Sequence, residues 1–293
     1  MDTVALRRAV WNGSIPCRIE LDPSESRVFD AVGPYFISLP RMSYIPLYMA
    51  EIYRFFTPFL IDTSVSCLEN AWLEFETVPL KCLLSFAEFM PVRYDRHWPV
   101  GVLYDLFTGR DPTVTSADEE DEHSLPWKLV LRFQNFPIKH IMRIDSGNTF
   151  QGAAFARNGH AKAVLGLSKS ESNKLWEALQ FHNFDHFWNI NEKILSETVA
   201  GPLRSFSVRV YVPSTPRVIQ QPIPPYVDNN EPQTVGTALN SLLPELFPSK
   251  RTPVLSRPVI HGVVISMSTP LIELFPIAMY PDGFLHITLA MSG

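Results

Sequence analysis

Two histidines spaced four residues apart are the strongest candidates for chemistry in this sequence. His182 and His186 lie in the stretch FHNFDHFWNI, residues 181–190, with Asp185 between them. Imidazoles at i and i+4 share one face of a helix and can bind zinc when further ligands join them. The stretch therefore raises two alternatives, a metal-dependent enzyme or a helix built to be buried.

The residues around these histidines favour the buried helix. His182 precedes Asn183, the expected N-cap, and need not be helical itself. At about 100° per residue, His186 lies about 200° around the helix from Phe184 and points away from the apolar stripe. No HExxH motif occurs and no third ligand is identifiable. We therefore expect no metal, and a packing role for the aromatic residues.

Catalytic signatures elsewhere in the chain are missing. The sequence contains no GxSxG elbow, no GxxxxGK loop and no GxGxxG turn. His140, His261 and His286 sit among apolar residues, and each is expected to be a structural histidine. The acidic run ADEEDEH (117–123) is interpreted as a solvated linker, because its like charges repel one another. The sequence predicts no catalytic residue and no cofactor.

The composition indicates a globular protein made of many short elements. Hydrophobic residues make up 46% of the 293 and charged residues 19%, and 26 prolines end or interrupt elements. A net charge of −5 does not favour bulk binding to nucleic acid or to an anionic membrane. The start MDTVALRRAVWNG does not read as a secretory signal, and Cys17, Cys67 and Cys82 are interpreted as reduced thiols. We expect a cytoplasmic protein whose membrane role, if it has one, is peripheral.

Hydrophobic periodicity predicts the same order of elements in the first and last parts of the chain. After a short helix at 3–11, we expect strand, strand, helix, strand, short helix and strand at 14–21, 35–41, 44–56, 71–80, 98–107 and 127–136. The same order is expected again at 205–213, 217–226, 234–247, 258–266, 270–280 and 284–291. A four-stranded sheet that carries one long helix is the ubiquitin-like β-grasp plan, although two unrelated α+β domains would give a similar pattern.

The segment between these parts, roughly 149–198, has no strand pattern and is expected to be helical. Ser168 and Glu171 form a capping box, after which an apolar helix face begins at Leu175. A second helix is expected to open at Asn183.

We therefore predict an α+β protein in which two ubiquitin-like β-grasp domains flank a helix-rich domain. The expected parts are an N-terminal helix at 1–13, a first ubiquitin-like domain at 14–145, a helix-rich domain at 146–200 and a second ubiquitin-like domain at 201–293. The first ubiquitin-like domain would carry an insert at 82–96 and an acidic loop at 111–123.

Seven stretches, spread in order over nearly the whole chain, carry a family resemblance. They are VWNGSIP (10–16), SLPRMSYIPL (38–47), LEFETVPLK (73–81), HWPVGVLYDL (97–106), LPWKLVLRFQNFP (125–137), LWEALQFHNFDHFWNIN (175–191) and YPDGFLHITL (280–289). Together they closely resemble the autophagy protein 5 family of fungal type. The resemblance implies two ubiquitin-like domains that flank a helix-rich domain, in agreement with the periodicity.

The resemblance also implies a function that composition does not show. Family members are joined through one lysine to the ubiquitin-like autophagy-related protein 12, and the conjugate binds the coiled-coil autophagy-related protein 16. The assembly acts like an E3: it engages the E2-like enzyme and promotes transfer of autophagy-related protein 8 to phosphatidylethanolamine on the isolation membrane. By this resemblance the chain is a scaffold without catalytic residues, peripheral on the preautophagosomal structure, and it binds no nucleic acid.

The chain departs from the family pattern at residues 82–96. CLLSFAEFMPVRYDR intervenes between Lys81 and His97, where the family runs directly into its Trp-Pro helix start. We hypothesise a retained intron or an error in the gene model. A genuine insert would be an exposed loop whose apolar residues favour aggregation.

A second departure concerns the acceptor lysine that the resemblance implies. In QGAAFARNG (151–159), Gln151 occupies the position of that lysine. A glutamine amide nitrogen is delocalised and cannot attack a thioester as a lysine amine does. Either this chain is not conjugated and binds its helical partner noncovalently, or another lysine substitutes. Lys162 is the nearest downstream candidate.

The resemblance further points to Trp11, Arg41 and Asp105 as residues of the partner-helix groove. Their motifs line or adjoin the groove that takes the amphipathic helix of autophagy-related protein 16 in the family. Each of the three could instead serve packing or lie on a solvated surface.

Overall fold

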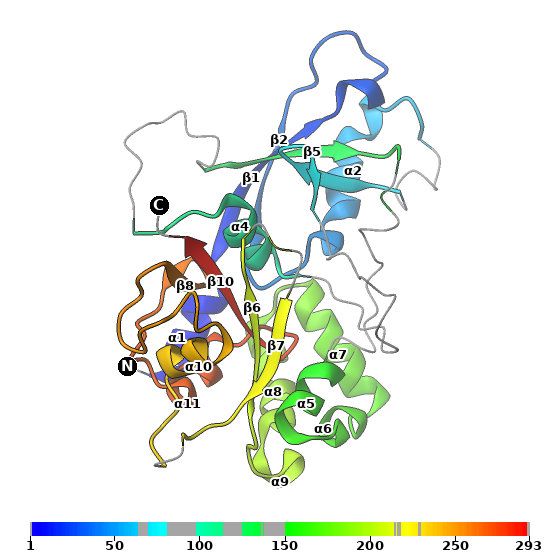
Figure 1. Ribbon diagram of the computed structural model, residues 1–293. Helices are drawn as coiled ribbons and strands as arrows, with labels where there is room; N and C mark the ends of the chain where they lie inside the picture. The colour runs from blue at the N-terminus through cyan, green and yellow to red at the C-terminus, as the bar shows by residue number, and fades with distance from the viewer. Residues whose placement is uncertain are drawn as a thin grey trace.

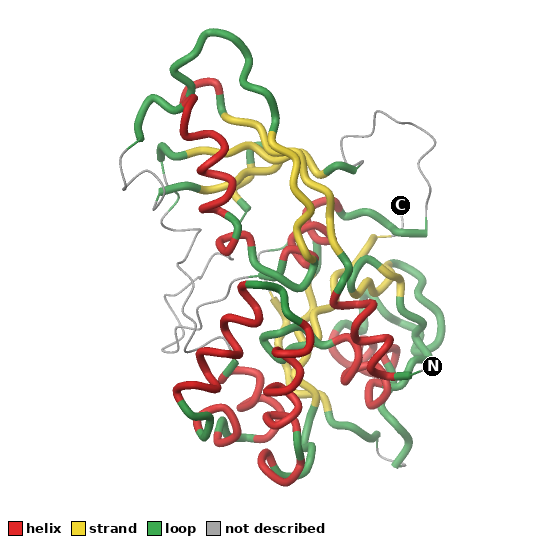
Figure 2. Tube along the Cα trace, turned by 180° about the vertical axis from the view of Figure 1, so that it is seen from behind, coloured by secondary structure: helices red, strands yellow, loops and turns green. Residues whose placement is uncertain are grey.

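The computed structural model describes residues 2–63, 70–80, 98–113, 125–135, 137, 150–213, 215, 218–227 and 230–291. Two mixed sheets and a helical region between them in sequence make up this part of the chain (Figure 1). Seen from behind, the helices of the middle region lie at the opposite end of the molecule from the first sheet (Figure 2). The predictions for the insert at 82–96, the run at 117–123, Cys67, Cys82 and His140 fall outside the described residues.

The first sheet has five strands in the order β2-β1-β5-β3-β4. Their bounds are β1 Ser14–Leu21, β2 Tyr35–Pro40, β3 Trp72–Phe75, β4 Val78–Pro79 and β5 Trp127–Arg132. β1 and β5 pair in parallel at the centre, and the other neighbours are antiparallel. Helix α2 (Met49–Phe56) lies beside this sheet and buries Ile52 and Phe56 (Figure 1). Short 3-10 helices lie at Pro23–Glu25, Ile45–Leu47 and Thr57–Phe59.

The second sheet repeats this topology in the order β7-β6-β10-β8-β9. Its strands are β6 Phe206–Tyr211, β7 Val218–Ile223, β8 Ser256–Ile260, β9 Val263–Val264 and β10 Leu285–Met291, with helices α10 (Val235–Leu242) and α11 (Leu271–Ala278). β6 and β10 again form a parallel pair at the centre, flanked by antiparallel neighbours. The predicted repetition of architecture is confirmed, and with it the α+β fold of two ubiquitin-like units around a helical region.

Each sheet has five strands rather than the predicted four, because two predicted strands are hairpins. The stretch 71–80 turns at Glu76 and Thr77, which have φ of 48° and 67°, and Phe75 pairs with Val78. The stretch 258–266 turns in the same way at His261 and Gly262, which have φ of 53° and 76°. Two-residue turns with both φ positive favour Asn-Gly or Asp-Gly. The prediction of a single strand was wrong in both stretches. Glu76-Thr77 contains neither residue of the preferred turn pairs, and His261-Gly262 contains only the glycine.

Five helices make up the middle region. They are α5 Gln151–Asn158, α6 Lys162–Leu165, α7 Lys169–Gln180, α8 Phe184–Leu195 and α9 Glu197–Ala200. The predicted capping box is confirmed: the Ser168 hydroxyl accepts from the Glu171 N–H at 3.2 Å, and the Glu171 carboxylate accepts from the Ser168 N–H at 3.1 Å. Asn183 caps α8 as predicted, since its side chain accepts from the backbone N–H of His186 at 3.0 Å.

Removal of the Ser168 cap is expected to destabilise α7. The Ser168→Ala chain should lose about 1 kcal/mol of unfolding free energy, because an orphan backbone N–H at the helix start loses its acceptor. Chemical denaturation followed by circular dichroism measures the change. Ser172→Ala, an exposed position inside the same helix, is the control and should be close to neutral. Equal losses in the two variants would contradict a capping role.

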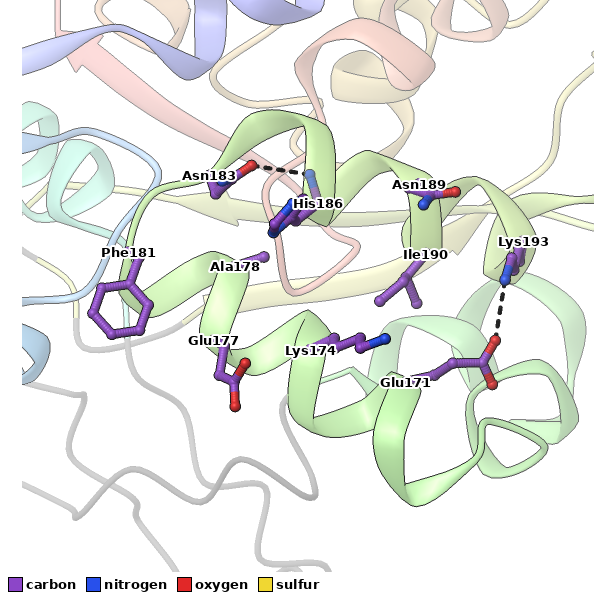
Figure 3. Close-up of a pocket in the computed structure, with 10 residues that line it drawn as sticks. All are labelled: Glu171, Lys174, Glu177, Ala178, Phe181, Asn183, His186, Asn189, Ile190 and Lys193. Carbon is purple, nitrogen blue, oxygen red and sulfur yellow. Dashed lines mark hydrogen bonds and ion pairs between the residues drawn. The ribbon is translucent and has the colours of Figure 1, made fainter.

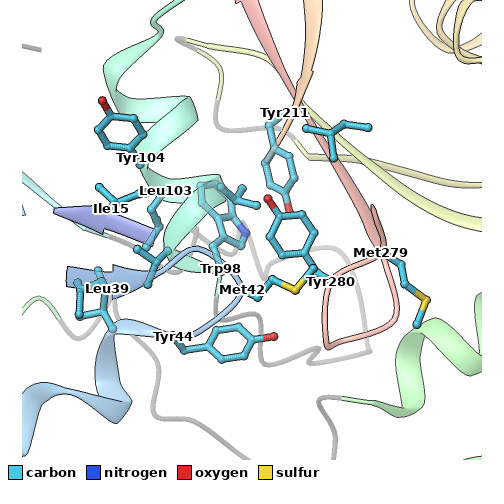
Figure 4. Close-up of a cluster of buried hydrophobic side chains, with 14 of the residues drawn as sticks. Ile15, Leu39, Met42, Tyr44, Trp98, Leu103, Tyr104, Tyr211, Met279 and Tyr280 are labelled. Carbon is cyan, nitrogen blue, oxygen red and sulfur yellow. The ribbon is translucent and has the colours of Figure 1, made fainter. Parts of the chain in front are cut away.

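A single buried core crosses from the first sheet into the second. Trp98 and Tyr104, at the start of and within helix α4 (Val100–Thr108), lie with Tyr211 and Tyr280 of the second unit in Figure 4. The rings of Trp98 and Tyr211 meet edge to face with centroids 4.8 Å apart. Helix α4 packs against β10, and the N-terminal helix α1 (Thr3–Trp11) packs against α11. Both ubiquitin-like units are therefore held together by apolar burial.

Candidate functional site

Trp11, at the end of α1, packs the N-terminal helix against the helical middle region. Its side chain is 1% exposed, its ring stacks on His182 with centroids 4.7 Å apart, and it meets the Phe187 ring at a tilt of 36° with centroids 4.9 Å apart. The indole N–H donates to the His182 carbonyl at 3.2 Å, while His182 Nε2 lies 2.9 Å from the Trp11 carbonyl oxygen. Trp11 and His182 are thus joined by two hydrogen bonds, each between one ring nitrogen and the other residue's carbonyl oxygen, and by a ring contact.

The two histidines that suggested a metal site do not share a helix face. His182 has φ of 51° and lies in the turn before α8, whereas His186 is inside the helix and exposed. The predicted failure of the i, i+4 geometry is confirmed. Burial against Trp11 lowers the pKa of His182 below its ordinary value. Among the residues that the structure describes, no group of three or more His, Cys, Asp or Glu side chains could hold a metal ion.

Arg41 and Asp105 meet at the junction of the two ubiquitin-like units. Arg41 follows β2, Asp105 lies in α4, and their side chains form an ion pair that is 11% and 6% exposed. The second carboxylate oxygen of Asp105 accepts the backbone N–H of Gly262, in the β8–β9 turn, at 3.0 Å. Burial raises the pKa of Asp105, whereas the Arg41 guanidinium and the Gly262 N–H lower it, and burial dominates.

Of the three predicted groove residues, Arg41 and Asp105 lie at the junction of the two units, whereas Trp11 packs against the helical middle region. The Arg41 N–H donates to the carbonyl of Gly13, two residues after Trp11, at 2.8 Å. Trp11 and Asp105 are buried and the Arg41 side chain is 11% exposed, and each has a packing or ion-pairing role within the chain. That these residues help to bind a partner helix stays a prediction. In that case they would act indirectly, by fixing the shape of the surface that the helix contacts.

The two acceptor candidates lie in the helical region. Gln151 is the first residue of α5, half-buried, and follows the buried Phe150. Lys162 is the first residue of α6 and is exposed. Of the two positions, Lys162 is the more exposed.

A groove between α7 and α8, which the sequence analysis missed, encloses about 540 Å³ (Figure 3). Helix α8 runs back along α7, and Ala178 and Ile190 are buried in its lining. The Lys193 ammonium and the Glu171 carboxylate form an ion pair at 3.1 Å that joins the two helices. Phe181, which is 81% exposed, lies at the other end of the groove. An aromatic residue just after the predicted helix was the feature of the sequence that could have drawn attention to this surface. The full lining is Glu171, Lys174, Glu177, Ala178, Phe181, Asn183, His186, Asn189, Ile190 and Lys193.

A buried polar network in the second unit explains His286. Its Nε2 lies 3.0 Å from both carboxylate oxygens of Asp282, and its Nδ1 lies 2.7 Å from the Tyr211 hydroxyl. Asp282 also accepts from Arg209 at 2.9 Å. Burial alone would raise the pKa of Asp282, but His286 and Arg209 bring it below its ordinary value. The predicted structural role of His286 is confirmed by this set of partners.

His261 is likewise structural, and it makes the fold sensitive to acid. Its Nε2 lies 2.8 Å from the Ala278 carbonyl oxygen, its ring stacks on Tyr280 at 4.1 Å, and burial lowers its pKa to about 3. Because the unfolded chain binds a proton near pH 6.5 and the folded chain does not, stability is lost as pH falls below about 6.5. Nearby charges from Arg41 and His286 act in the same direction.

Replacement of His261 by asparagine should flatten this pH dependence. Asparagine tolerates positive φ and does not titrate, so the variant should lack a slope of up to about 1.4 kcal/mol per pH unit between 6.5 and about 3. Urea denaturation from pH 7.5 to 4.5 measures the slope. The exposed His186→Asn variant, measured over the same pH range, is the matched control for the substitution. An unchanged slope in His261→Asn would contradict the burial of a neutral imidazole.

No helix within the described residues is both long and apolar enough to cross a bilayer.

Comparisons with known proteins match all three parts of the chain. Three family models match in order: "Autophagy protein ATG5, UblA domain" at 10–133, "Autophagy protein ATG5, alpha-helical bundle region" at 152–197 and "Autophagy protein ATG5, UblB domain" at 205–289.

Similar curated proteins cover nearly the whole chain. Autophagy protein 5 of Aspergillus terreus is 38% identical over 98% of this chain and 97% of its own length. Autophagy protein 5 of Emericella nidulans is 36% identical over 99% of this chain and 98% of its own length. The crystal structure of Kluyveromyces marxianus Atg5 superposes with a TM-score of 0.72 at 21% identity, over 97% of this chain and 98% of that one, which shows the shared fold.

Proposed function

This chain belongs to the autophagy protein 5 family and has a role in autophagy, and from that membership we propose that it is a conjugation scaffold. In this proposal it accepts the ubiquitin-like autophagy-related protein 12 and binds autophagy-related protein 16. The resulting assembly promotes lipidation of autophagy-related protein 8. The observation that carries the proposal is the ordered match of three domain models over the two ubiquitin-like units and the helical region.

The scaffold role supposes that the partners supply the chemistry. The conjugate would engage the E2-like enzyme for autophagy-related protein 8, while this chain contributes surface and no catalytic residue. The chain would be cytoplasmic and would reach the isolation membrane as a peripheral protein. In the same proposal it uses neither a cofactor nor a nucleic acid.

The proposed site for the autophagy-related protein 16 helix is the junction around Trp11, Arg41 and Asp105. An amphipathic helix binds best in a groove whose walls are already in place. The contacts of Asp105 hold α4 against the second unit, and those of Trp11 hold α1 against the middle region, which would keep the walls of such a groove in place. The same contacts favour an indirect role for these residues over direct contact with the partner.

A noncovalent scaffold is the second candidate, because glutamine stands where the family motif has its acceptor lysine. An amide nitrogen does not attack a thioester, so Gln151 cannot form the isopeptide bond. In this form the chain binds the helix of autophagy-related protein 16 and carries no modifier. Lys162 is the residue that would rescue the covalent form, since it is exposed in the adjacent helix.

Reconstitution with autophagy-related protein 12 and its activating and conjugating enzymes distinguishes the two candidates. A covalent adduct on a denaturing gel, lost in Lys162→Arg, is expected if Lys162 substitutes. An absent adduct with the partner helix still bound supports the noncovalent scaffold, and Gln151→Lys should then create the adduct. The matched control is Gln221→Lys, at an exposed position of β7 in the second sheet, and it should form no adduct. Loss of both adduct and helix binding in every variant would contradict the proposed function.

A further inference from the structure

The Arg41 side chain passes between three glycines that come from three different parts of the chain. Gly13 follows α1, Gly101 lies in α4, and Gly262 lies in the β8–β9 turn. The Arg41 N–H donates to the Gly13 carbonyl, and the Arg41 carbonyl accepts from the Gly101 N–H, each at 2.8 Å. Backbone and side chain of this one residue therefore connect the N-terminal segment, the first ubiquitin-like unit and the second.

A side chain at either of two of these glycines would press against Arg41. A Cβ atom at Gly101 would lie 3.0 Å from the Arg41 Cβ and 3.1 Å from its carbonyl oxygen. A Cβ atom at Gly262 would lie 2.8 Å from the Arg41 guanidinium nitrogen Nη2. The passage is thus shaped around the arginine side chain.

The ion pair at the end of this passage lies within the first unit, and one hydrogen bond joins it to the second unit. Asp105 binds the Arg41 guanidinium with one carboxylate oxygen and the Gly262 N–H with the other. A rotated arrangement of the units would leave the Gly262 N–H without its acceptor and would take one hydrogen bond from a buried carboxylate, which costs free energy. The apolar contacts between the units, such as that between Trp98 and Tyr211, supply burial but do not satisfy these polar groups.

We infer that Arg41, Asp105 and Gly262 form a latch that fixes the orientation of the two ubiquitin-like units, while the apolar core supplies most of the stability of their contact. This inference concerns the chain alone and does not depend on conjugation or on any partner.

Replacement of the ion pair by an apolar pair separates orientation from stability. In the full chain, Arg41→Met with Asp105→Leu removes both charges together, which is often neutral or stabilising for a buried pair. Spin-labelled unnatural amino acids, placed at the exposed positions of Lys128 in β5 and Gln221 in β7, report the distance between the two sheets by electron spin resonance. We expect an unchanged or higher melting temperature with a broader or shifted distance distribution. A distribution identical to that of the unsubstituted chain would overturn the latch.

A pair of glycine substitutions tests the latch without altering a charge. Gly262 and Gly201 both have φ of 76°, so alanine meets the same backbone strain at either position. Only at Gly262 does the added Cβ meet Arg41, since nothing lies within 4 Å of a Cβ at Gly201. We expect Gly262→Ala, and not Gly201→Ala, to broaden or shift the distance distribution. Equal behaviour of the two variants, whether both change or neither does, would overturn the proposal.

Discussion

Replacement of Asp105 alone by alanine is expected to lower the free energy of unfolding by about 3–5 kcal/mol. The substitution leaves the Arg41 guanidinium buried without its carboxylate, and it leaves the Gly262 N–H without its acceptor. A buried charge that loses its partner cannot recover hydration inside the junction. The loss should exceed that of the apolar double variant, even though the double variant removes more polar groups.

Guanidinium denaturation followed by circular dichroism measures this loss. Asp111→Ala is the matched control, because Asp111 pairs with Arg257 at 2.8 Å but the Arg257 side chain is 38% exposed. A partly exposed ion pair of this kind, with the Asp111 side chain 16% exposed, contributes about 1 kcal/mol or less. If Asp105→Ala lost no more than Asp111→Ala, Arg41 could not be desolvated as described.

Replacement of Trp11 by alanine is the second large effect, expected at about 3–5 kcal/mol for a fully buried aromatic residue. The indole ring fills the space between α1 and the start of α8, against His182 and Phe187. Its removal leaves a cavity and also deprives the His182 carbonyl of its donor. The N-terminal helix should detach from the middle region before the sheets unfold.

Amide hydrogen exchange resolves that order of events. Amides of α1 should exchange faster in Trp11→Ala, while those of β1 and β5 remain protected until global unfolding. Val4→Ala lies in the same helix at a position that is 46% exposed, and it should cost about 0.5 kcal/mol or less. Protection of α1 that matched that of the Val4→Ala chain would show that Trp11 does not anchor the helix.

The features that sequence alone predicted depend on local patterns. The duplicated order of strands and helices follows from hydrophobic periodicity, which each segment carries by itself. The caps at Ser168 and Asn183 involve residues three apart, so their spacing in the chain fixes their geometry. The orientation of His186 away from the buried stripe follows from helix geometry in the same way.

The features that sequence missed depend on contacts between distant segments. Arg41 was singled out by resemblance, but nothing near it indicates that Asp105 is its partner or that Gly262 closes the site. The groove between α7 and α8 exists only once the two helices pack together. The hairpin turn at Glu76 and Thr77 has positive φ at both residues. Because neither is a glycine, asparagine or aspartate, the residue types at this turn did not indicate a hairpin.

The central parallel pairs set a sequence of events during synthesis on the ribosome. Each sheet joins its opening strand to its closing one: β1 pairs with β5, more than a hundred residues later, and β6 pairs with β10. A nascent chain that has emerged as far as β9 has both outer hairpins of its second unit, β6–β7 and β8–β9, but not the strand β10 that lies between them. That unit can close only when Leu285–Met291 leaves the exit tunnel. Until then its apolar strands are exposed to chaperones and to neighbouring nascent chains.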